Sequence, residues 1–242
     1  MKAADGVLAH VSTCEDRIDR FASQRRRIAP MRSAEHAVRP SGNSQLELLS
    51  GFLRPQSAFL EIAATDCSLS LSVADRVRRA YAVAHSAVIT GTRRFPANFH
   101  LIAAEGTCVP VPPDSIDVAY SDGLVDHLDL KETSEQLANV YRALARGGVL
   151  VCCARNRLLD ACDVERAGPP HTFGELYAIL RKVGFRRVVQ YARRAGASVR
   201  LSGTAMRTLE WSVGMMPHAQ RARACNGMAL RELLGICLVA TK

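Results

Sequence analysis

Two acidic side chains, Glu61 and Asp66, flank a short turn in the stretch AFLEIAATD at residues 58–66. A second apolar run, AYAVA, ends at Ala84 and is followed by His85. Polar groups placed directly after successive apolar strands are typical of α/β domains that hold the hydroxyl and amino groups of a nucleotide-like ligand. The spacing therefore predicts a ligand site at the ends of these two runs.

Three residues depart from the usual chemistry of such a site. Ala63 and Thr65 stand in the turn where glycine lets the backbone approach a ligand, and the β-branched Thr65 resists positive φ most strongly. Ala84 stands where a carboxylate would bond ribose hydroxyls. His85 offers a substitute acceptor, although side chains alternate along a strand and the neighbour of Ala84 faces the other way.

Short apolar segments alternate with helical patterns from Ala58 onward, which predicts βαβ units, a parallel sheet and right-handed crossovers. Thr172 and Glu175 form the spacing of a capping box, so a helix is expected to begin there and to end at Gly184. The expected strands cover residues 58–62, 80–84, 98–104, 115–121, 148–154, 186–192 and 235–242, and the expected helices cover 68–77, 134–146, 172–184 and about 202–233.

These elements predict an α/β fold, a Rossmann-like doubly wound sheet of seven strands with an N-terminal helix and a helical insertion before the last strand. Residues 1–45 are expected to form an N-terminal helical arm, either packed on the domain or binding an anion. Residues 46–242 are expected to form the α/β domain, with the insertion at about 202–233.

The chain has 242 residues, 48% of them hydrophobic, and a net charge of +9, which admits an anionic partner without requiring one. Eight cysteines without a CxxC pair favour reduced, buried thiols, with Cys152 and Cys153 in a core strand. No His, Cys or Asp cluster has metal-ligand spacing, so no metal is expected. Without an apolar stretch of signal or membrane-spanning character, a cytoplasmic location away from the membrane is expected.

The segments from about 55 to 190 resemble class I S-adenosylmethionine (SAM)-dependent methyltransferases. The resemblance implies the fold above, SAM as cofactor and S-adenosylhomocysteine as product. The most specific matching segments are AEGTCVPVPPDSIDVAYS (104–121) and HTFGELYAILRKVGF (171–185). The other matching segments are EIAATD (61–66), DHL (126–128), LARGG (144–148) and RNRL (155–158).

The resemblance also implies roles for single residues. Glu61 would help to hold the amino acid end of SAM, whereas Glu105 and Gly106 would contact the adenine. Ser121 would line the methyl-donor pocket. The predicted cofactor-binding set is Glu61, Ala63, Thr65, Asp66, Ala84, His85, Glu105, Gly106 and Ser121.

Asp126 and His127 form an adjacent acid–imidazole pair, which predicts a general-base role, although His127 fits a structural role equally well.

Two functions follow. The first is a SAM-dependent methyltransferase acting on a small-molecule acceptor. The second is a catalytically silent relative with a degenerate glycine turn, serving as a binding or regulatory subunit in a homodimer or beside a partner methyltransferase. A nucleic-acid target is disfavoured, because aromatic residues are only 5% of the chain and stacking platforms are missing.

Overall fold

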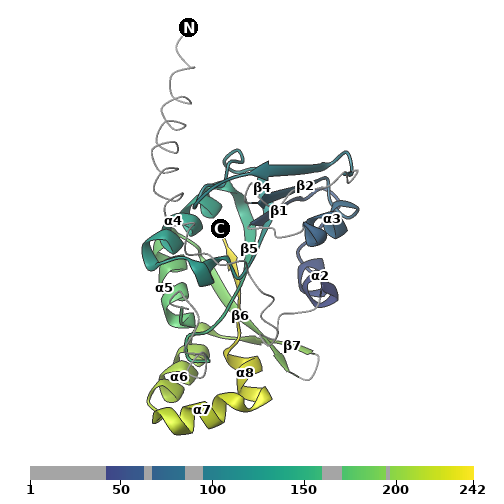
Figure 1. Ribbon diagram of the computed structural model, residues 1–242. Coiled ribbons are helices and arrows are strands. Elements are labelled where there is room, and N and C mark those ends of the chain that lie inside the picture. The colour runs from purple at the N-terminus through teal and green to yellow at the C-terminus, as the bar shows by residue number, and fades with distance from the viewer. Residues whose placement is uncertain (1–41, 63–66, 85–94, 160–170, 195–196) are drawn as a thin grey trace, which may run out of the picture. The chain divides into compact units, whose positions relative to one another are not determined.

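The computed structural model describes residues 42–62, 67–84, 95–159, 171–194 and 197–242 (Figure 1). The helix expected in the N-terminal arm falls on residues 1–41, outside the described residues. All described residues belong to one compact unit, Pro40–Lys242. Its helices are α2 (Gly42–Ser50), α3 (Ser68–Ala74), the 3-10 turn η2 (Leu124–His127), α4 (Leu130–Ala143), α5 (Phe173–Val183), α6 (Gly203–Gly214), α7 (His218–Asn226) and α8 (Met228–Leu234). Its strands are β1 (Ala58–Ile62), β2 (Arg79–Ala84), β3 (Phe99–Ala103), β4 (Ile116–Asp122), β5 (Leu144–Ala154), β6 (Arg187–Arg194), β7 (Ala197–Leu201) and β8 (Ile236–Thr241).

The strands form one sheet in the order β3-β2-β1-β4-β5-β8-β6-β7. Strands β1 to β5 pair in parallel, whereas β8 runs antiparallel to both β5 and β6. The predicted doubly wound α/β fold is confirmed. The sheet has one strand more than the seven expected, because β7 folds back as an antiparallel hairpin on β6 and forms the edge.

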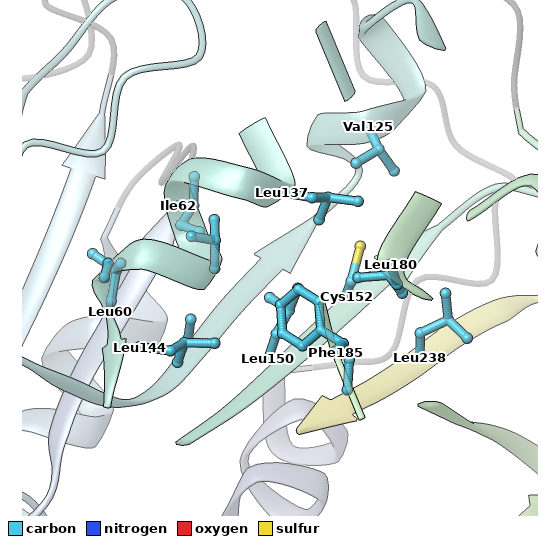
Figure 2. Packing of buried hydrophobic residues seen from close by; sticks show 14 of the residues in the cluster. Leu60, Ile62, Val125, Leu137, Leu144, Leu150, Cys152, Leu180, Phe185 and Leu238 are labelled. Atoms are coloured by element: carbon cyan, nitrogen blue, oxygen red, sulfur yellow. The ribbon is translucent and has the colours of Figure 1, made fainter. Parts of the chain in front are cut away.

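Helices cover both faces of the sheet (Figure 1), and alternating side chains of the strands supply a core on each side. In β1, Leu60 faces the core beneath α4 and α5, while Phe59 faces the core beneath α2 and α3. Figure 2 shows the first core, where Leu137 of α4 and Leu180 of α5 lie over strand residues such as Leu150. The two cores fix the sheet against its helices and so hold the strand ends in place.

Local sequence signals set the starts of α4 and α5. The Thr172 hydroxyl caps α5 by accepting from the backbone N–H of Glu175. The Glu175 carboxylate in turn accepts from the backbone N–H of Thr172, so the predicted capping box is confirmed. Asp129 and Glu132 form the same box at α4. Helix α4 ends at Ala143, three residues before the end expected from the pattern.

Gly148 lies in the irregular first part of β5. A Cβ at this position would come within 2.9 Å of the Ala145 carbonyl oxygen and 3.0 Å of that of Ile116. The glycine is therefore required by the close approach of β4 and β5, whose register shifts between Ile116 and Val118.

Three helices, α6 to α8, occupy the chain between β7 and β8, as the predicted insertion requires. Helix α6 begins with Ser202, whose hydroxyl accepts from the backbone N–H of Ala205, and it buries Met206 and Val213. Among the described residues, no helix combines the length and the apolar character needed to span a bilayer.

Candidate functional site

The carboxyl ends of β1 to β4 meet at one edge of the sheet, where β1 lies between β2 and β4. Chain order reverses at this point, which is where open α/β sheets bind ligands. A small pocket of about 10 Å³ lies there. That volume is enough for about one water molecule and lies far below the roughly 300–1,000 Å³ of pockets that enclose a whole small molecule. Its described lining residues are Ile62, Val83, Ala84, Ala104, Gly106, Cys108, Leu124 and Gln136.

Two predicted site residues, Ala84 and Gly106, line this pocket together. Ala84 ends β2 opposite Ala103 of β3, and its buried methyl group offers no hydrogen-bond acceptor. Gly106 follows β3 with φ of +62°, a conformation that L side chains rarely adopt. The two residues therefore lie together at one pocket, and Ala84 gives it an apolar wall at the position where a ribose is expected.

Ser121, a third predicted residue, lies in β4 directly beside Ile62 of β1. It is 4% exposed, and its Oγ has no hydrogen-bond partner among the described residues. Buried hydroxyl groups in proteins are nearly always paired, so an unpaired one next to a pocket marks a place for a ligand or a water molecule.

Gln136 of α4 is a pocket residue that the sequence did not identify. Its side chain is 2% exposed, and within the described part of the chain neither Oε1 nor Nε2 has a partner. The available signal was its helical spacing, since Gln136 sits on the same buried face of α4 as Thr133, Leu137 and Val140. A polar side chain on an otherwise buried stripe requires either a partner or a function.

Glu61 points to the opposite face of the sheet, toward α3. Its Oε2 accepts from the backbone N–H of Ser70 at 3.0 Å and from the Ser70 hydroxyl. The N-cap of α3 is Cys67, whose side chain makes no capping bond. Glu61 therefore takes over the capping function for this helix and fixes its first turn beside β1.

The predicted pair Asp126 and His127 separates in the structure. Asp126 is 3% exposed, whereas His127 is exposed to solvent. Asp126 accepts from the backbone N–H of Arg155 at 2.9 Å and from its Nε at 3.3 Å. Burial raises the pKa of the Asp126 carboxyl, and the bonds and charge of Arg155 oppose the shift without cancelling it.

The other predicted residues divide into two groups. Glu105 is exposed at the end of β3, next to Gly106 of the pocket. Ala63, Thr65, Asp66 and His85 lie outside the described residues.

A buried polar network connects the segment after β5, the start of α5 and the middle of α6. Glu210 of α6 accepts from the backbone N–H groups of Phe173 and Gly174, at 2.6 and 2.9 Å, and from Asn156 Nδ2 at 2.7 Å. His171, directly before the N-cap of α5, is buried and pairs through Nε2 with Thr133 Oγ1 at 3.0 Å. The network ties the helical insertion to the sheet.

An open groove of about 580 Å³ lies over this network. Trp211 is 68% exposed on one wall, beside Arg207. The groove combines an aromatic surface, a cation and several hydroxyl groups, with described lining residues Leu158, Thr172, Gly174, Thr204, Arg207, Thr208, Glu210 and Trp211.

The predicted core thiols are also present as free cysteines. Cys152 and Cys153 are buried in β5, and burial raises the pKa of the Cys152 thiol, which keeps it protonated and unreactive.

Comparison with known proteins gives a family similarity over part of the chain. Residues 57–152 match the family described as the methyltransferase domain. That segment holds β1 to β4 and most of β5, and so the whole pocket described above. A comparison with curated proteins gave no significant match.

Solved structures share the fold at low sequence identity. A candidate O-methyltransferase from Nostoc punctiforme is 15% identical with a TM-score of 0.55, over 83% of this chain and 56% of the Nostoc chain, so the present chain spans little more than half of that protein. A candidate methyltransferase from Haloferax volcanii, solved in complex with a methyltransferase activator, is 12% identical with a TM-score of 0.59, over 81% and 86%. A SAM-dependent methyltransferase from Archaeoglobus fulgidus is 17% identical with a TM-score of 0.53, over 84% and 95%.

The family match shows a similarity to the methyltransferase domain over residues 57–152, and the solved structures show that the fold is shared with known methyltransferases. The matched segment contains the pocket at the switch point of the sheet, so both similarities include the site described above.

Proposed function

We propose that this chain transfers a methyl group from SAM to a small-molecule acceptor, and that SAM binds where β1 to β4 end. The observation that carries the proposal is the pair of buried polar side chains at this edge, Ser121 and Gln136, without partners among the described residues. Each such unpaired group costs about 1–3 kcal/mol, which a ligand that pairs with it recovers on binding. The residues therefore fit an uncharged, hydrogen-bonding part of the cofactor.

Bound SAM supplies a methyl group already activated on a sulfonium, so the protein's main contribution is alignment and exclusion of water. Ile62, Val83 and Leu124 provide an apolar lining for the pocket. Glu61 holds the first turn of α3 against β1, and Asp126 holds the start of the segment after β5 through Arg155. In this proposal Asp126 is a positioning residue, and the exposed His127 is the member of the predicted pair that an acceptor can reach.

The acceptor is proposed to bind beneath the helical insertion, in the groove beside α6. Trp211 offers a face for stacking, Arg207 offers a positive charge, and Thr208 offers a hydroxyl group. These groups favour a planar or anionic small molecule. Once an acceptor is known, Trp211→Ala is expected to raise its KM more than it lowers kcat.

Calorimetric titration of S-adenosylhomocysteine into the purified protein tests the proposal, beside a Thr65→Gly/Ala84→Asp variant and an Ala84→Asn control. The wild type is expected to bind, and the restored variant to bind about tenfold more tightly, since the introduced carboxylate would add charge-assisted hydrogen bonds. The asparagine of the control has a similar shape without the charge and should give a smaller gain. Absence of wild-type binding at millimolar ligand would contradict the proposal.

Ala84 itself favours a second function, that of a silent methyltransferase-like subunit, because it removes the acceptor expected at the ribose position. Binding by the restored variant alone would support this alternative. The mass of the native complex by light scattering would then distinguish a homodimer from a complex with a partner methyltransferase. The free, buried thiols Cys152 and Cys153 support a reducing, cytoplasmic location for either function.

A further inference from the structure

We propose that Cys153 and Cys237 form an oxidisable thiol pair, in which a peroxide closes a disulfide bond that locks β8 onto β5. The two residues lie directly opposite each other on these antiparallel strands, and their Sγ atoms are 3.4 Å apart. The proposal concerns a covalent modification of the sheet and does not depend on methyl transfer.

The backbone around the pair has the geometry that a disulfide requires. The Cys153 carbonyl accepts from the backbone N–H of Gly123, whereas the backbone N–H of Cys237 donates to the Oε1 atom of Gln190. Each cysteine therefore directs its backbone groups away from the other, which makes the two a non-hydrogen-bonded pair. The Cα atoms of such pairs are about 4.5 Å apart, within the roughly 4.4–6.8 Å that disulfides span. The bond therefore closes without a change of strand register.

The neighbouring cysteine shows that the contact is specific to this position. Cys152 belongs to the core beneath α4 and α5, whereas Cys153 belongs to the core beneath α2 and α3, against which Cys237 also packs. Because side chains alternate along a strand, Cys152 faces away from the Cys237 thiol. Of the two adjacent cysteines of β5, Cys153 is therefore the one that closes the bond.

The two thiols differ in exposure and in hydrogen bonding. Cys153 is 6% exposed and its thiol donates to the Cys237 sulfur, while Cys237 is half-buried. That hydrogen bond, together with burial, holds the pKa of the Cys153 thiol well above its usual value, so Cys153 keeps its proton. Cys237 is therefore the nucleophile that meets the oxidant, and Cys153 is the resolving thiol.

Two balanced steps form the bond. The Cys237 thiolate attacks one oxygen of hydrogen peroxide, the O–O bond breaks, and a sulfenic acid forms, while the released hydroxide takes the former thiol proton and leaves as water. The Cys153 sulfur then attacks the sulfenic sulfur, the S–O bond breaks, and the Cys153 proton leaves with the hydroxide as a second water molecule. The thiol pair is oxidised by two electrons, and the peroxide is reduced to water.

The disulfide constrains a large part of the chain, because it joins residues that are 84 positions apart in the sequence. The loop between them contains α5, β6, β7 and the three helices of the insertion. Closing so long a loop restricts the unfolded chain and so stabilises the folded one. Oxidation therefore fastens the strand through which the β6–β7 hairpin joins the sheet.

Peptide mapping after peroxide treatment tests the proposal. The folded full-length protein is treated with hydrogen peroxide, and its free thiols are alkylated as it is denatured. Trypsin then releases residues 147–155 and 232–242 as separate peptides unless a disulfide joins them. The wild type is expected to yield the joined peptides, and its melting temperature is expected to rise by about 5–10 °C. Dithiothreitol should reverse both changes.

Cys152→Ala is the matched control, because it removes the adjacent thiol of the same tryptic peptide and leaves the pair intact. It is expected to yield the joined peptides and to show the wild-type rise in melting temperature over its own reduced form. Cys153→Ala and Cys237→Ala are expected to show neither change. A melt of each reduced variant verifies that it is folded.

Three results would each overturn the proposal. The first is a wild type that yields only separate peptides after the peroxide has converted the exposed Met215 to its sulfoxide, which verifies that the oxidant has acted. The second is joined peptides that persist in Cys153→Ala, since these would identify Cys152 as the partner of Cys237. The third is a joined wild type whose melting temperature is unchanged or lower, because the bond would then strain the sheet instead of locking it.

Discussion

Glu61 at the end of β1 accepts two hydrogen bonds from one residue of α3, the backbone N–H and the hydroxyl of Ser70. Both groups are buried, so the contact joins a strand end to a helix start without water. The carboxylate that the resemblance assigns to the ligand is thus a structural group that holds the first turn of α3.

Ser70→Ala is expected to lower the free energy of unfolding by about 1.5–3 kcal/mol, because it removes a hydrogen bond to a buried carboxylate. Urea denaturation measures the change. The control is Ser72→Ala in the same helix, where the exposed hydroxyl bonds only to the Ser68 carbonyl. That change should be within about 0.5 kcal/mol of the wild type, and an equal loss in both variants would contradict a special role for Ser70.

Asp126 is expected to make stability depend on pH. Burial raises the pKa of this carboxyl. Between the unfolded and the folded pKa, the folded protein therefore keeps a proton that the unfolded chain has already released. The contribution of the carboxyl to stability is therefore full below the ordinary aspartate pKa of about 3.9 and falls as pH rises through the raised folded value.

Asp126→Asn removes this titration, so the stability of the wild type relative to the variant should decrease from about pH 4 upward. Denaturant midpoints across this range measure the effect. Asp75→Asn, a change at an exposed residue after α3, controls for the loss of one negative charge. If the stability of the wild type relative to Asp126→Asn instead increases with pH, the effect of Arg155 on the Asp126 pKa is larger than that of burial.

Glu210→Ala is expected to destabilise the protein by about 2–4 kcal/mol, since three donors lose one acceptor group. Thermal unfolding followed by tryptophan fluorescence is a convenient measurement, because Trp211 is the next residue. Glu210→Gln keeps one acceptor oxygen and should lose clearly less. Equal losses in the two variants would mean that packing, rather than hydrogen bonding, fixes α6 to α5.

Gln136→Met and Gln190→Met are expected to have opposite effects on the ligand-free protein. The first replaces an unpaired buried amide by an apolar side chain of similar shape, so the melting temperature should stay level or rise. The second removes bonds to Gly235 and Cys237 and should lower the melting temperature by several degrees. Calorimetry distinguishes the two, and destabilisation of similar size in both would argue that the Gln136 amide is paired.

The capping box at Thr172 and Glu175 could be predicted because both partners lie within one turn of helix, and the same is true of the strand alternation that defines the fold. The edge strand β7 could not be predicted from the sequence, because its five residues form a strand only by pairing with β6. The turn that joins β6 and β7 has a weak sequence signal.

The site shows the same division. Gly106 and Ala84 follow from strand ends, which the sequence marks clearly. The partners of Glu61 and Asp126 belong to other elements, and the unpaired amide of Gln136 is visible only once the neighbours of α4 are in place. Sequence patterns locate the edge of the sheet, whereas tertiary contacts decide what each side chain does there.

The order of the strands has a consequence for synthesis on the ribosome. Within the described sheet, β6 pairs only with β7 and β8, so the β6–β7 hairpin joins the five parallel strands through β8 alone. A nascent chain that has emerged only as far as α8 can pair β1 to β5, but the hairpin has no strand through which to join their sheet. The sheet becomes continuous only after Ile236–Thr241 has emerged, which makes the last strand in sequence the one that commits the domain to its native state.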